Sequence, residues 1–574
     1  MRRALGALLC IIAVSGVAAS SASAHATLVG TDPSLNAVVK TEPKHVLFRF
    51  NQAVEGQFGA VKVFDAKSQR VDDGSSFHPN GKQSALGVKL KAGLPHGTYT
   101  AAYRVISADG HPVEGGVVFS IGQAGAASAK SIDQLIGTGR TGVATQTAFD
   151  IDRGLDYLAI ALSIGLLAFI LLCWRRGLAA VEGPGEPWAR AASAFNARAR
   201  RLLVAAAVLG LTVAVLGIAF EGATAGGTSF WKAIDSTVIH DVLKTRFGTI
   251  WGLKVLVWVA LLGALVVSGP RRPLVPLAPA VLLAVTPALS GHADTQGDRL
   301  LVVPSDILHV SAMSVWIGGL FALVLLVPRA TAKLEPGDRS RLLAALLVRF
   351  SAIALGAVIV LMATGTLQSI EYLRSFGDFL HTAFGRAVLI KIILLLGLIL
   401  LGAVNRRRLV PGMKALAESG EAPGATGRTL RDTLRTEVAL VVTVLGVTAA
   451  LVGYPPPVSL GAGAGGVNVQ KHLGPLILET TIDPARVGPN TMHLYLFEAK
   501  GGAPFTGTKE ITATATLKSK GLGSLPVKLI KSGPGHYTAN SFQLVPGGDW
   551  TIEINDRVSV FDQYTTTIKA KVAG

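Results

Sequence analysis

The chain of 574 residues has only two cysteines, Cys10 and Cys173, and few charged residues. Neither cysteine lies in a stretch typical of a folded exported domain, which excludes a disulfide framework and a thiolate metal site. Only 16% of the residues are charged and 50% are hydrophobic, whereas about 25% are charged in an ordinary soluble protein. This composition excludes a purely cytoplasmic enzyme, a disordered tail and a fibrous repeat, and it predicts a protein that lies largely in a membrane.

Residues 1–24 have the pattern of a secretory signal peptide. A basic start at Arg2 and Arg3 precedes an apolar run, and residues 22–24 read Ala-Ser-Ala, a typical cleavage site. The alternative is an uncleaved anchor helix. Cleavage after residue 24 makes His25 the mature N-terminus, where one residue offers both an α-amine and an imidazole to a metal ion.

Two stretches outside the apolar region show the alternation of polar and apolar residues that is typical of β-strands. Residues 25–122 contain runs such as HVLFRFNQ and GTYTAAYRVIS between turn signals, which predicts an exported β-sandwich. The small, polar residues 123–149 are a predicted linker. A second linker at residues 455–466 precedes runs such as HLYLFEA and WTIEI, so residues 467–574 are a predicted C-terminal β-sandwich.

Between residues 150 and 454, eight apolar segments have the length of about 17 to 25 residues that a membrane-crossing helix needs. We therefore predict an eight-helix transmembrane bundle. Its segments lie near residues 154–174, 202–220, 249–268, 273–290, 305–327, 343–366, 385–404 and 436–454. The fourth segment contains Pro276, Pro279 and Pro287, so the sequence does not define where that helix begins and ends.

The basic residues predict how these helices are oriented. If the signal peptide exports the first domain, the loops expected in the cytoplasm carry 19 Lys or Arg and the outer loops carry 5. This distribution agrees with the positive-inside rule. Much of the net charge of +18 is therefore a membrane-orientation signal and not a nucleic-acid footprint. An even number of crossings of the inner or plasma membrane predicts that both β-domains are extracytoplasmic.

A short internal repeat divides the membrane region. Residues 245–254 read TRFGTIWGLK and residues 382–391 read TAFGRAVLIK, which both fit the pattern T-x-F-G-x-x-x-x-x-K. The two copies open the third and the seventh predicted helices. We therefore predict a duplicated four-helix unit, with both halves in the same orientation.

The twelve histidines all lie outside the predicted cytoplasmic loops, and four of them belong to the membrane region. His309 lies about five residues into the fifth predicted helix, with Asp306 at i−3 and Met313 at i+4 on the same face. Imidazole and thioether ligands suit copper, especially Cu(I), and ionisable groups inside a membrane usually face a cavity or a pathway. The alternative is that Asp306 stays wet near the interface and that His309 only bonds a neighbouring helix.

In the first domain, Asp109 and His111 follow a predicted strand and are two residues apart, so their side chains can point the same way. With His25 they would offer an amine, two imidazoles and a carboxylate oxygen, a set that favours Cu(II). Without His25, an ordinary turn explains them equally well. His493 and His536 have no motif around them, and we expect them to be ordinary surface or strand residues.

These residues resemble a known pair of protein families. Residues 25–122 resemble the periplasmic copper-binding protein CopC in the His-Ala start and in the stretch YRVISADGHPVEG at 103–115. The resemblance implies that Cu(II) is bound by His25, Asp109 and His111. Some members also have a Met-rich Cu(I) site, which is not expected here because the chain has no Met between residues 25 and 150.

The membrane region is similar to CopD, the inner-membrane partner of CopC that is implicated in copper uptake. The similarity lies in the motifs SGHAD at 290–294, DILHVSAMSVWIGGL at 306–320, RFS at 349–351, TGT at 364–366, FGRAVLIK at 384–391 and NRR at 405–407. Fusions of the two families are copper-resistance or copper-transport proteins. The resemblance therefore implies a copper-binding protein of the cell membrane.

We expect this protein to capture Cu(II) outside the membrane and to pass copper to or across the bilayer near His292, His309 and Met313. The change from nitrogen and oxygen toward sulphur ligands suggests reduction to Cu(I). The sequence has no ATPase signature, so transport would be passive or coupled to an ion gradient. Two alternatives stay open: electron transfer by haem held on His292 and His309, and a copper sensor or buffer without transport. A third alternative is an oxidative copper enzyme built on the N-terminal His, for which an acidic Asp109 ligand is a poor match to reducible copper chemistry. We expect no enzyme activity.

Overall fold

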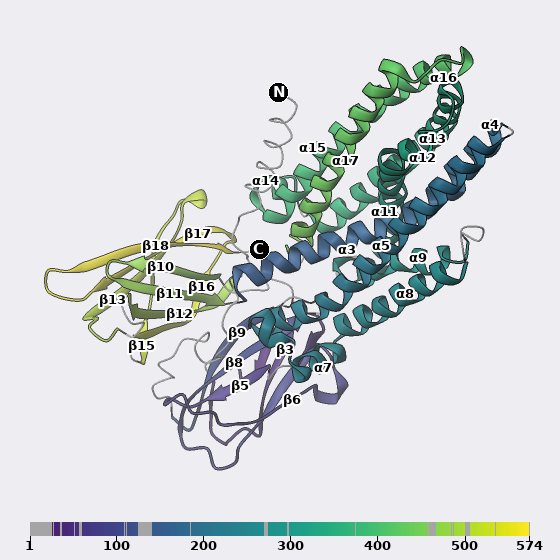
Figure 1. The fold of residues 1–574 in the computed structure, drawn as a ribbon. Helices are drawn as coiled ribbons and strands as arrows, with labels where there is room; N and C mark the ends of the chain where they lie inside the picture. The colour runs from purple at the N-terminus through teal and green to yellow at the C-terminus, as the bar shows by residue number, and fades with distance from the viewer. Residues whose placement is uncertain are drawn as a thin grey trace. The chain divides into compact units, whose positions relative to one another are not determined.

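The computed structural model contains a β-domain, a helical region and a second β-domain (Figure 1). The residues that it describes are 26, 28–34, 37–50, 52–56, 60–107, 110, 112–123, 141–183, 185–268, 274–294, 298–373, 375–454, 456–457, 467–483, 485, 487–499, 505–533 and 535–572. The predicted signal peptide lies outside these residues.

The N-terminal domain consists of two sheets, as the alternating sequence predicts. One sheet has the order β1 (Leu28–Asp32), β3 (His45–Phe50), β7 (Ala85–Leu90) and β6 (Asp72–Phe77). The other has the order β2 (Val38–Val39), β9 (Pro112–Ile121), β8 (Gly97–Ser107) and β4 (Val54–Glu55), and β5 (Val61–Phe64) pairs with β8. Alternate residues of β3, namely Val46, Phe48 and Phe50, are buried, because successive side chains of a strand point to opposite faces. The predicted β-sandwich is confirmed.

Seven helices of the described residues are long and apolar enough to cross a membrane, by length and composition. They are α3 (Val143–Phe169), α5 (Glu186–Gly226), α8 (Arg246–Ser268), α11 (Arg299–Phe321), α13 (Pro336–Tyr372), α15 (Ala383–Val404) and α17 (Gly424–Val452). Short π-helical turns at Ile170–Trp174, Ala322–Leu326 and Asn405–Leu409 extend three of them into α4 (Arg175–Val181), α12 (Val327–Ala330) and α16 (Val410–Glu418). Other short helices of this region include α6 (Phe230–Ala233), α7 (Ser236–Lys244) and α14 (Asp378–His381).

The prediction of eight long membrane helices is wrong, because the count in the described residues is seven. The expected fourth segment forms two short helices, α9 (Leu277–Leu283) and α10 (Val285–Ser290). Pro287 has no N–H to donate to the carbonyl of Leu283, four residues earlier. The Thr286 hydroxyl donates to that carbonyl instead, at 2.9 Å. Proline therefore breaks a segment whose hydropathy alone predicts one helix.

The broken pair α9–α10 runs back along α8. Arg246 is the first residue of α8, and its guanidinium donates to the carbonyl of Leu289, near the end of α10, at 2.9 Å. The carboxylate of Asp294, just beyond α10, also pairs with Arg246. The chain thus returns to the end of the bundle at which α8 begins.

The internal repeat has the same local structure in both copies. Thr245 and Thr382 each precede a long helix, and their hydroxyl oxygens accept from the N–H groups of Gly248, at 3.1 Å, and Gly385, at 2.9 Å. A Cβ atom on either glycine would overlap a carbonyl oxygen of the short helix before it, α7 or α14. The repeat is therefore a helix cap with a close backbone contact, which supports the predicted duplication.

Helices α3 and α11 open the two halves and pack against each other without intervening side chains. A Cβ on Gly165 would overlap the carbonyl oxygen of Ser314, and a Cβ on Gly318 would overlap the backbone of Gly165. Small residues allow helix backbones to approach this closely in membranes. The α3–α11 contact brings the two halves together.

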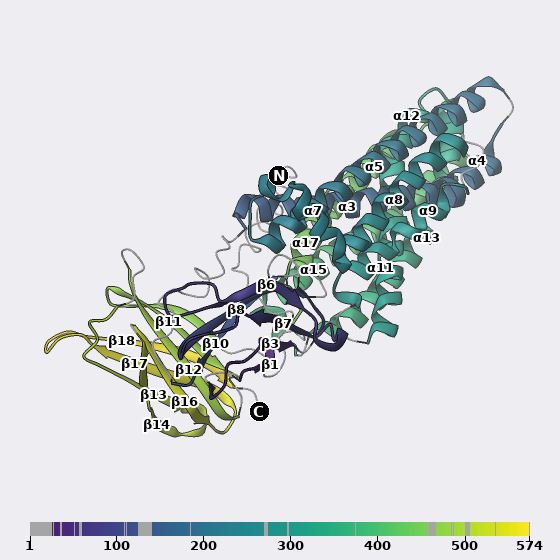
Figure 2. The same cartoon turned by 90° about the horizontal axis from the view of Figure 1, so that it is seen from below.

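The C-terminal domain has two antiparallel sheets around one core (Figures 1 and 2). The first has the order β10 (Val467–Leu473), β11 (Leu476–Asp483), β12 (Gly488–Glu498), β16 (His536–Leu544) and β15 (Ile530–Gly533). The second has the order β14 (Leu522–Val527), β13 (Glu510–Leu517), β17 (Gly548–Arg557) and β18 (Gln563–Val572). Leu494 from the first sheet and Trp550 from the second belong to the shared core, and both are fully buried.

Candidate functional site

The residues predicted to bind Cu(II), His25, Asp109 and His111, lie outside the described residues. Their described neighbours belong to the N-terminal β-domain. Ala26 is 2% exposed and packs in the core of this domain. Strands β8 and β9 pair directly, with Ile106 opposite Pro112. The predicted Cu(II) site therefore stays a prediction.

Polar side chains of two membrane helices meet in a stripe. Asp306 and His309 lie one turn apart on α11, and Thr364 and Gln368 lie one turn apart on α13. The Nδ1 atom of His309 is 2.8 Å from the Thr364 hydroxyl, and the Gln368 amide donates to Asp306 at 3.3 Å. The motifs at 306–320 and 364–366 are thus brought together by helix packing.

The hydrogen bonds of Thr364 favour one tautomer of His309. The Thr364 hydroxyl donates its only hydrogen to the carbonyl of Val360, at 2.7 Å, so its oxygen accepts from His309 Nδ1. The Nε2 atom of neutral His309 then keeps its lone pair. Histidines that bind metals usually have this arrangement, in which the other ring nitrogen donates to a neighbouring group. His309 is therefore held in a form that can ligate a metal ion.

Two further helices contribute to this region. Lys391 of α15, the last residue of the second repeat copy, interacts electrostatically with Asp306 and His309. Tyr157 of α3 also interacts with the Asp306 carboxylate. We call Asp306, His309, Thr364, Gln368 and Lys391 the Asp306 cluster. It is built from three helices and adjoins a fourth.

The other two residues of the predicted membrane path lie on either side of this cluster. His292 donates from Nε2 to the carbonyl of Tyr454 at 3.1 Å and interacts electrostatically with Asp306. Met313 is partly buried and packs against the core of the bundle, one turn beyond His309 on α11. Within the described ranges, no three His, Cys, Asp or Glu side chains are grouped closely enough to hold a metal ion. The described candidate ligands therefore lie one after another and do not surround a single metal ion.

A buried ion pair in the first half escaped the sequence analysis. Lys254, the last residue of the first repeat copy, donates to Asp156 of α3 at 2.8 Å, and their side chains are 1% and 5% exposed. The ammonium group also lies 4.1 Å from the ring centre of Trp251. Lys254 corresponds to Lys391 in the repeat, so a lysine at the same place in both copies was the available signal.

The C-terminal histidines are strand residues, but they are not on the surface. His493 of β12 and His536 of β16 are 5% and 4% exposed. Their rings are joined by a hydrogen bond of 3.1 Å between Nδ1 of His493 and Nε2 of His536. Burial lowers the pKa of His493 to about 4. Burial, with a smaller effect of His493, lowers the pKa of His536 to about 3.

These low pKa values predict a pH-dependent stability. Both histidines are neutral in the fold, whereas they take up protons near pH 6.5 when unfolded. Their contribution is therefore complete above pH 6.5 and is lost as the pH falls toward the folded pKa values, by about 1.4 kcal/mol per pH unit for each histidine. Scanning calorimetry of the full-length protein at pH 7.5 and 5 should show this loss. The double variant His493→Phe and His536→Phe should lose less, and an equal loss in both proteins would contradict the prediction.

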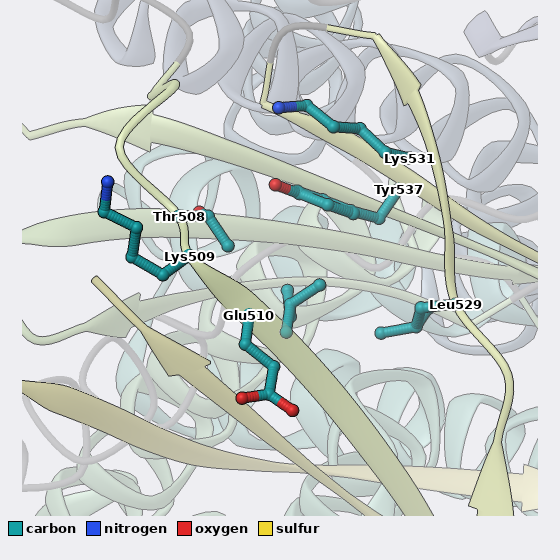
Figure 3. A pocket seen from close by; sticks show the side chains of 7 residues that line it. Thr508, Lys509, Glu510, Leu529, Lys531 and Tyr537 are labelled. Carbon is teal, nitrogen blue, oxygen red and sulfur yellow. The ribbon is translucent and has the colours of Figure 1, made fainter. Parts of the chain in front are cut away.

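The C-terminal domain also has a cavity of about 320 Å³, which is not lined by His493 or His536 (Figure 3). Its lining includes Lys509, Glu510 and Lys531 but no histidine, cysteine or methionine. The Glu510 carboxylate is paired with Arg557 at 2.6 Å. We therefore do not assign a copper site to this cavity.

Comparison with known proteins agrees with the order of the parts. The CopC domain matches residues 28–122, the copper resistance protein D-like N-terminal domain matches residues 144–300, and copper resistance protein D matches residues 344–451. The chain is 28% identical to copper transport protein CutJ of Bacillus subtilis (strain 168) over 555 residues, which cover 94% of each protein.

Two further relatives match single parts. Copper resistance protein D of Pseudomonas syringae pv. tomato is 29% identical over 276 residues, or 46% of this chain and 86% of that protein. The crystal structure of CopC from Methylosinus trichosporium OB3b has 30% sequence identity and covers 17% of this chain and 93% of its own, with a TM-score of 0.16.

A β-domain, seven long apolar helices and a second β-domain define a multi-pass membrane protein with a folded domain at each end. The chain has a CopC domain followed by a CopD membrane domain, and it is similar over 94% of its length to a copper transport protein.

Proposed function

We propose that this protein captures Cu(II) outside the cell membrane with His25, Asp109 and His111 and passes copper to or across the bilayer along α11. The observation that carries the membrane step is the hydrogen bond that leaves Nε2 of His309 free to ligate. The likeness to a copper transport protein over 94% of the chain supports copper as the cargo.

The order of ligands along α11 suits copper that reaches this helix as Cu(I), after Cu(II) has taken one electron from a reductant outside this chain. Asp306, His309 and Met313 follow one another on the helix, at a rise of about 1.5 Å per residue. The donor atom changes from oxygen to nitrogen to sulphur in that order, and softer ligands select Cu(I). Copper that enters near His292 would therefore meet softer ligands as it moves along α11.

We propose the same sidedness for both β-domains. The basic residues favour the inner loops, and the pair α9–α10 brings the chain back to the beginning of α8. With this return, the first residue of α3 and the last residue of α17 belong to the same end of the bundle. Labelling of single cysteines introduced at exposed residues His96 and His472 with an impermeant reagent tests this orientation, and protection of either one in intact cells would contradict it.

Replacement of His309 should abolish most copper movement. In vesicles that contain the full-length protein, His309→Ala is expected to lower the initial rate of copper uptake at least tenfold, because the imidazole ligand is lost. Thr364→Val keeps the ligand but removes the group that orients it, and loss of such a partner typically costs 10- to 100-fold in metal affinity. We expect Thr364→Val to raise KM for copper more than it lowers the maximal rate.

The matched control is His381→Ala, which removes an exposed histidine at the end of α14. It should leave the uptake rate unchanged. Wild-type rates in His309→Ala vesicles would refute the path along α11. Copper binding without uptake in the wild-type protein would instead favour a sensor or buffer.

A further inference from the structure

We propose that His493 and His536 form a two-coordinate Cu(I) site in the C-terminal domain. The family matches end at residue 451, so they do not cover this pair. The proposal depends on the proposed function only in taking copper as the metal that the protein handles. It does not depend on the path along α11.

Strand pairing holds the two rings together. β12 and β16 are antiparallel neighbours, with His493 opposite Thr538 and Tyr495 opposite His536. The two histidines are therefore diagonal neighbours on one face of the sheet. Their ring planes differ by 16°, and their facing nitrogens are 3.1 Å apart. One nitrogen of each ring therefore faces the other ring across the two strands.

The hydrogen bond between the rings uses only one nitrogen of each histidine. The other nitrogen of each ring, which we call the outer nitrogen, is not part of it. His493 Nε2 and His536 Nδ1 are buried and have no hydrogen-bond partner among the described residues. Buried polar groups without partners are rare and usually have a functional reason. Both rings are also neutral at pH 7 because burial lowers their pKa values, so each has a lone pair to offer.

Binding of Cu(I) needs only a rearrangement of protons within the pair. Before binding, one N–H is shared between the facing nitrogens and one is on an outer nitrogen. When Cu(I) takes the place of the shared hydrogen, that hydrogen moves to the other outer nitrogen, so both rings stay neutral and no electron is transferred. A metal–imidazole bond is about 2 Å long, so the facing nitrogens would have to separate by about 1 Å.

The surroundings favour a monovalent ion. Tyr495 stacks on His536 with ring centres 4.2 Å apart, and Glu479 of β11 lies opposite Tyr495 and interacts with it electrostatically. One nearby carboxylate can balance one positive charge. Structural Zn²⁺ sites need four ligands, and the described residues provide no group of three. Cu(I) is stable with only two nitrogen ligands, and this pair offers two facing imidazole nitrogens.

The test is a Cu(I) titration of the full-length protein in detergent, without oxygen, against the colorimetric chelator bicinchoninate. Leucine and methionine have similar volumes, but only methionine has a soft sulphur ligand. His493→Leu is expected to lose one equivalent of bound Cu(I), whereas His493→Met should keep it. The control His472→Leu changes an exposed histidine of β10 in the same sheet and should keep every equivalent.

X-ray absorption supplies a second measurement. The wild-type spectrum should contain the strong pre-edge peak of two-coordinate copper with nitrogen neighbours. This contribution should be missing from the spectrum of His493→Leu. Equal Cu(I) stoichiometry in the wild type, His493→Leu and His536→Leu would overturn the proposal, and so would a loss that is the same in the leucine and methionine variants. Failure of His309→Ala to affect uptake would remove the membrane path but would leave these counts unchanged.

Discussion

Gly165→Ala should destabilise the helical region by about 3 kcal/mol, near the upper end of the range for overpacked cores. The added methyl group would overlap the carbonyl oxygen of Ser314 on α11, and a backbone atom cannot rotate away as a side chain does. Helices α3 and α11 would have to separate. Thermal unfolding of the detergent-purified protein, followed by size-exclusion fluorescence, measures the effect as a lower midpoint and a lower yield.

The matched control for this substitution is Gly397→Ala on α15. A Cβ on Gly397 would meet no atom within 4 Å. Alanine there should be neutral or stabilising by up to about 1 kcal/mol, because it is a better helix former than glycine. Equal midpoints for the two alanine variants would show that the α3–α11 contact is not as close as described.

Lys254→Met should be at least as damaging, at about 3–5 kcal/mol, since it leaves the buried Asp156 carboxylate without its partner. The double variant Asp156→Leu with Lys254→Met should recover most of this loss, because replacing both members of a buried pair is often neutral. Unfolding midpoints of the two single variants and the double variant form a complete cycle. A double variant as unstable as Lys254→Met would contradict this explanation.

An exposed ion pair provides the comparison. Arg190 and Glu186 are 3.2 Å apart on α5, and their side chains are 54% and 75% exposed. Arg190→Ala should cost only about 0.3–0.5 kcal/mol. Comparison of Lys254→Met with Arg190→Ala would then measure the effect of burial, because the nitrogen–oxygen distances of the two ion pairs, 2.8 Å and 3.2 Å, are similar.

Local sequence patterns were sufficient for the elements with a simple period. The alternation in HVLFRF predicted a strand with one buried face, and β3 has that burial. Long apolar runs predicted seven of the helices correctly. The prediction of one long helix in the fourth segment failed. Hydropathy measures the transfer of side chains from water to an apolar phase, and it does not register the missing N–H of Pro287, which breaks the segment into α9 and α10.

The sequence predicted only the relative positions of those candidate residues that lie on the same helix. The spacing of Asp306, His309 and Met313 places them on one face of α11. The partner of His309 is Thr364, 55 residues later, and its position depends on how α11 and α13 pack. The pair His493 and His536 is 43 residues apart, and only the register of β12 and β16 brings the two rings together.

The two halves of the bundle have diverged in what they hold. The first helix of each half contains Asp-x-Leu, at 156–158 in α3 and 306–308 in α11. The first half has Ala159 and Ser163 where the second half has His309 and Met313. The first half therefore has the buried ion pair Asp156–Lys254 at the place where the second half has Asp306, His309 and Lys391. A charge pair that is neutralised within the first half leaves only the second half with an imidazole and a thioether beside its carboxylate.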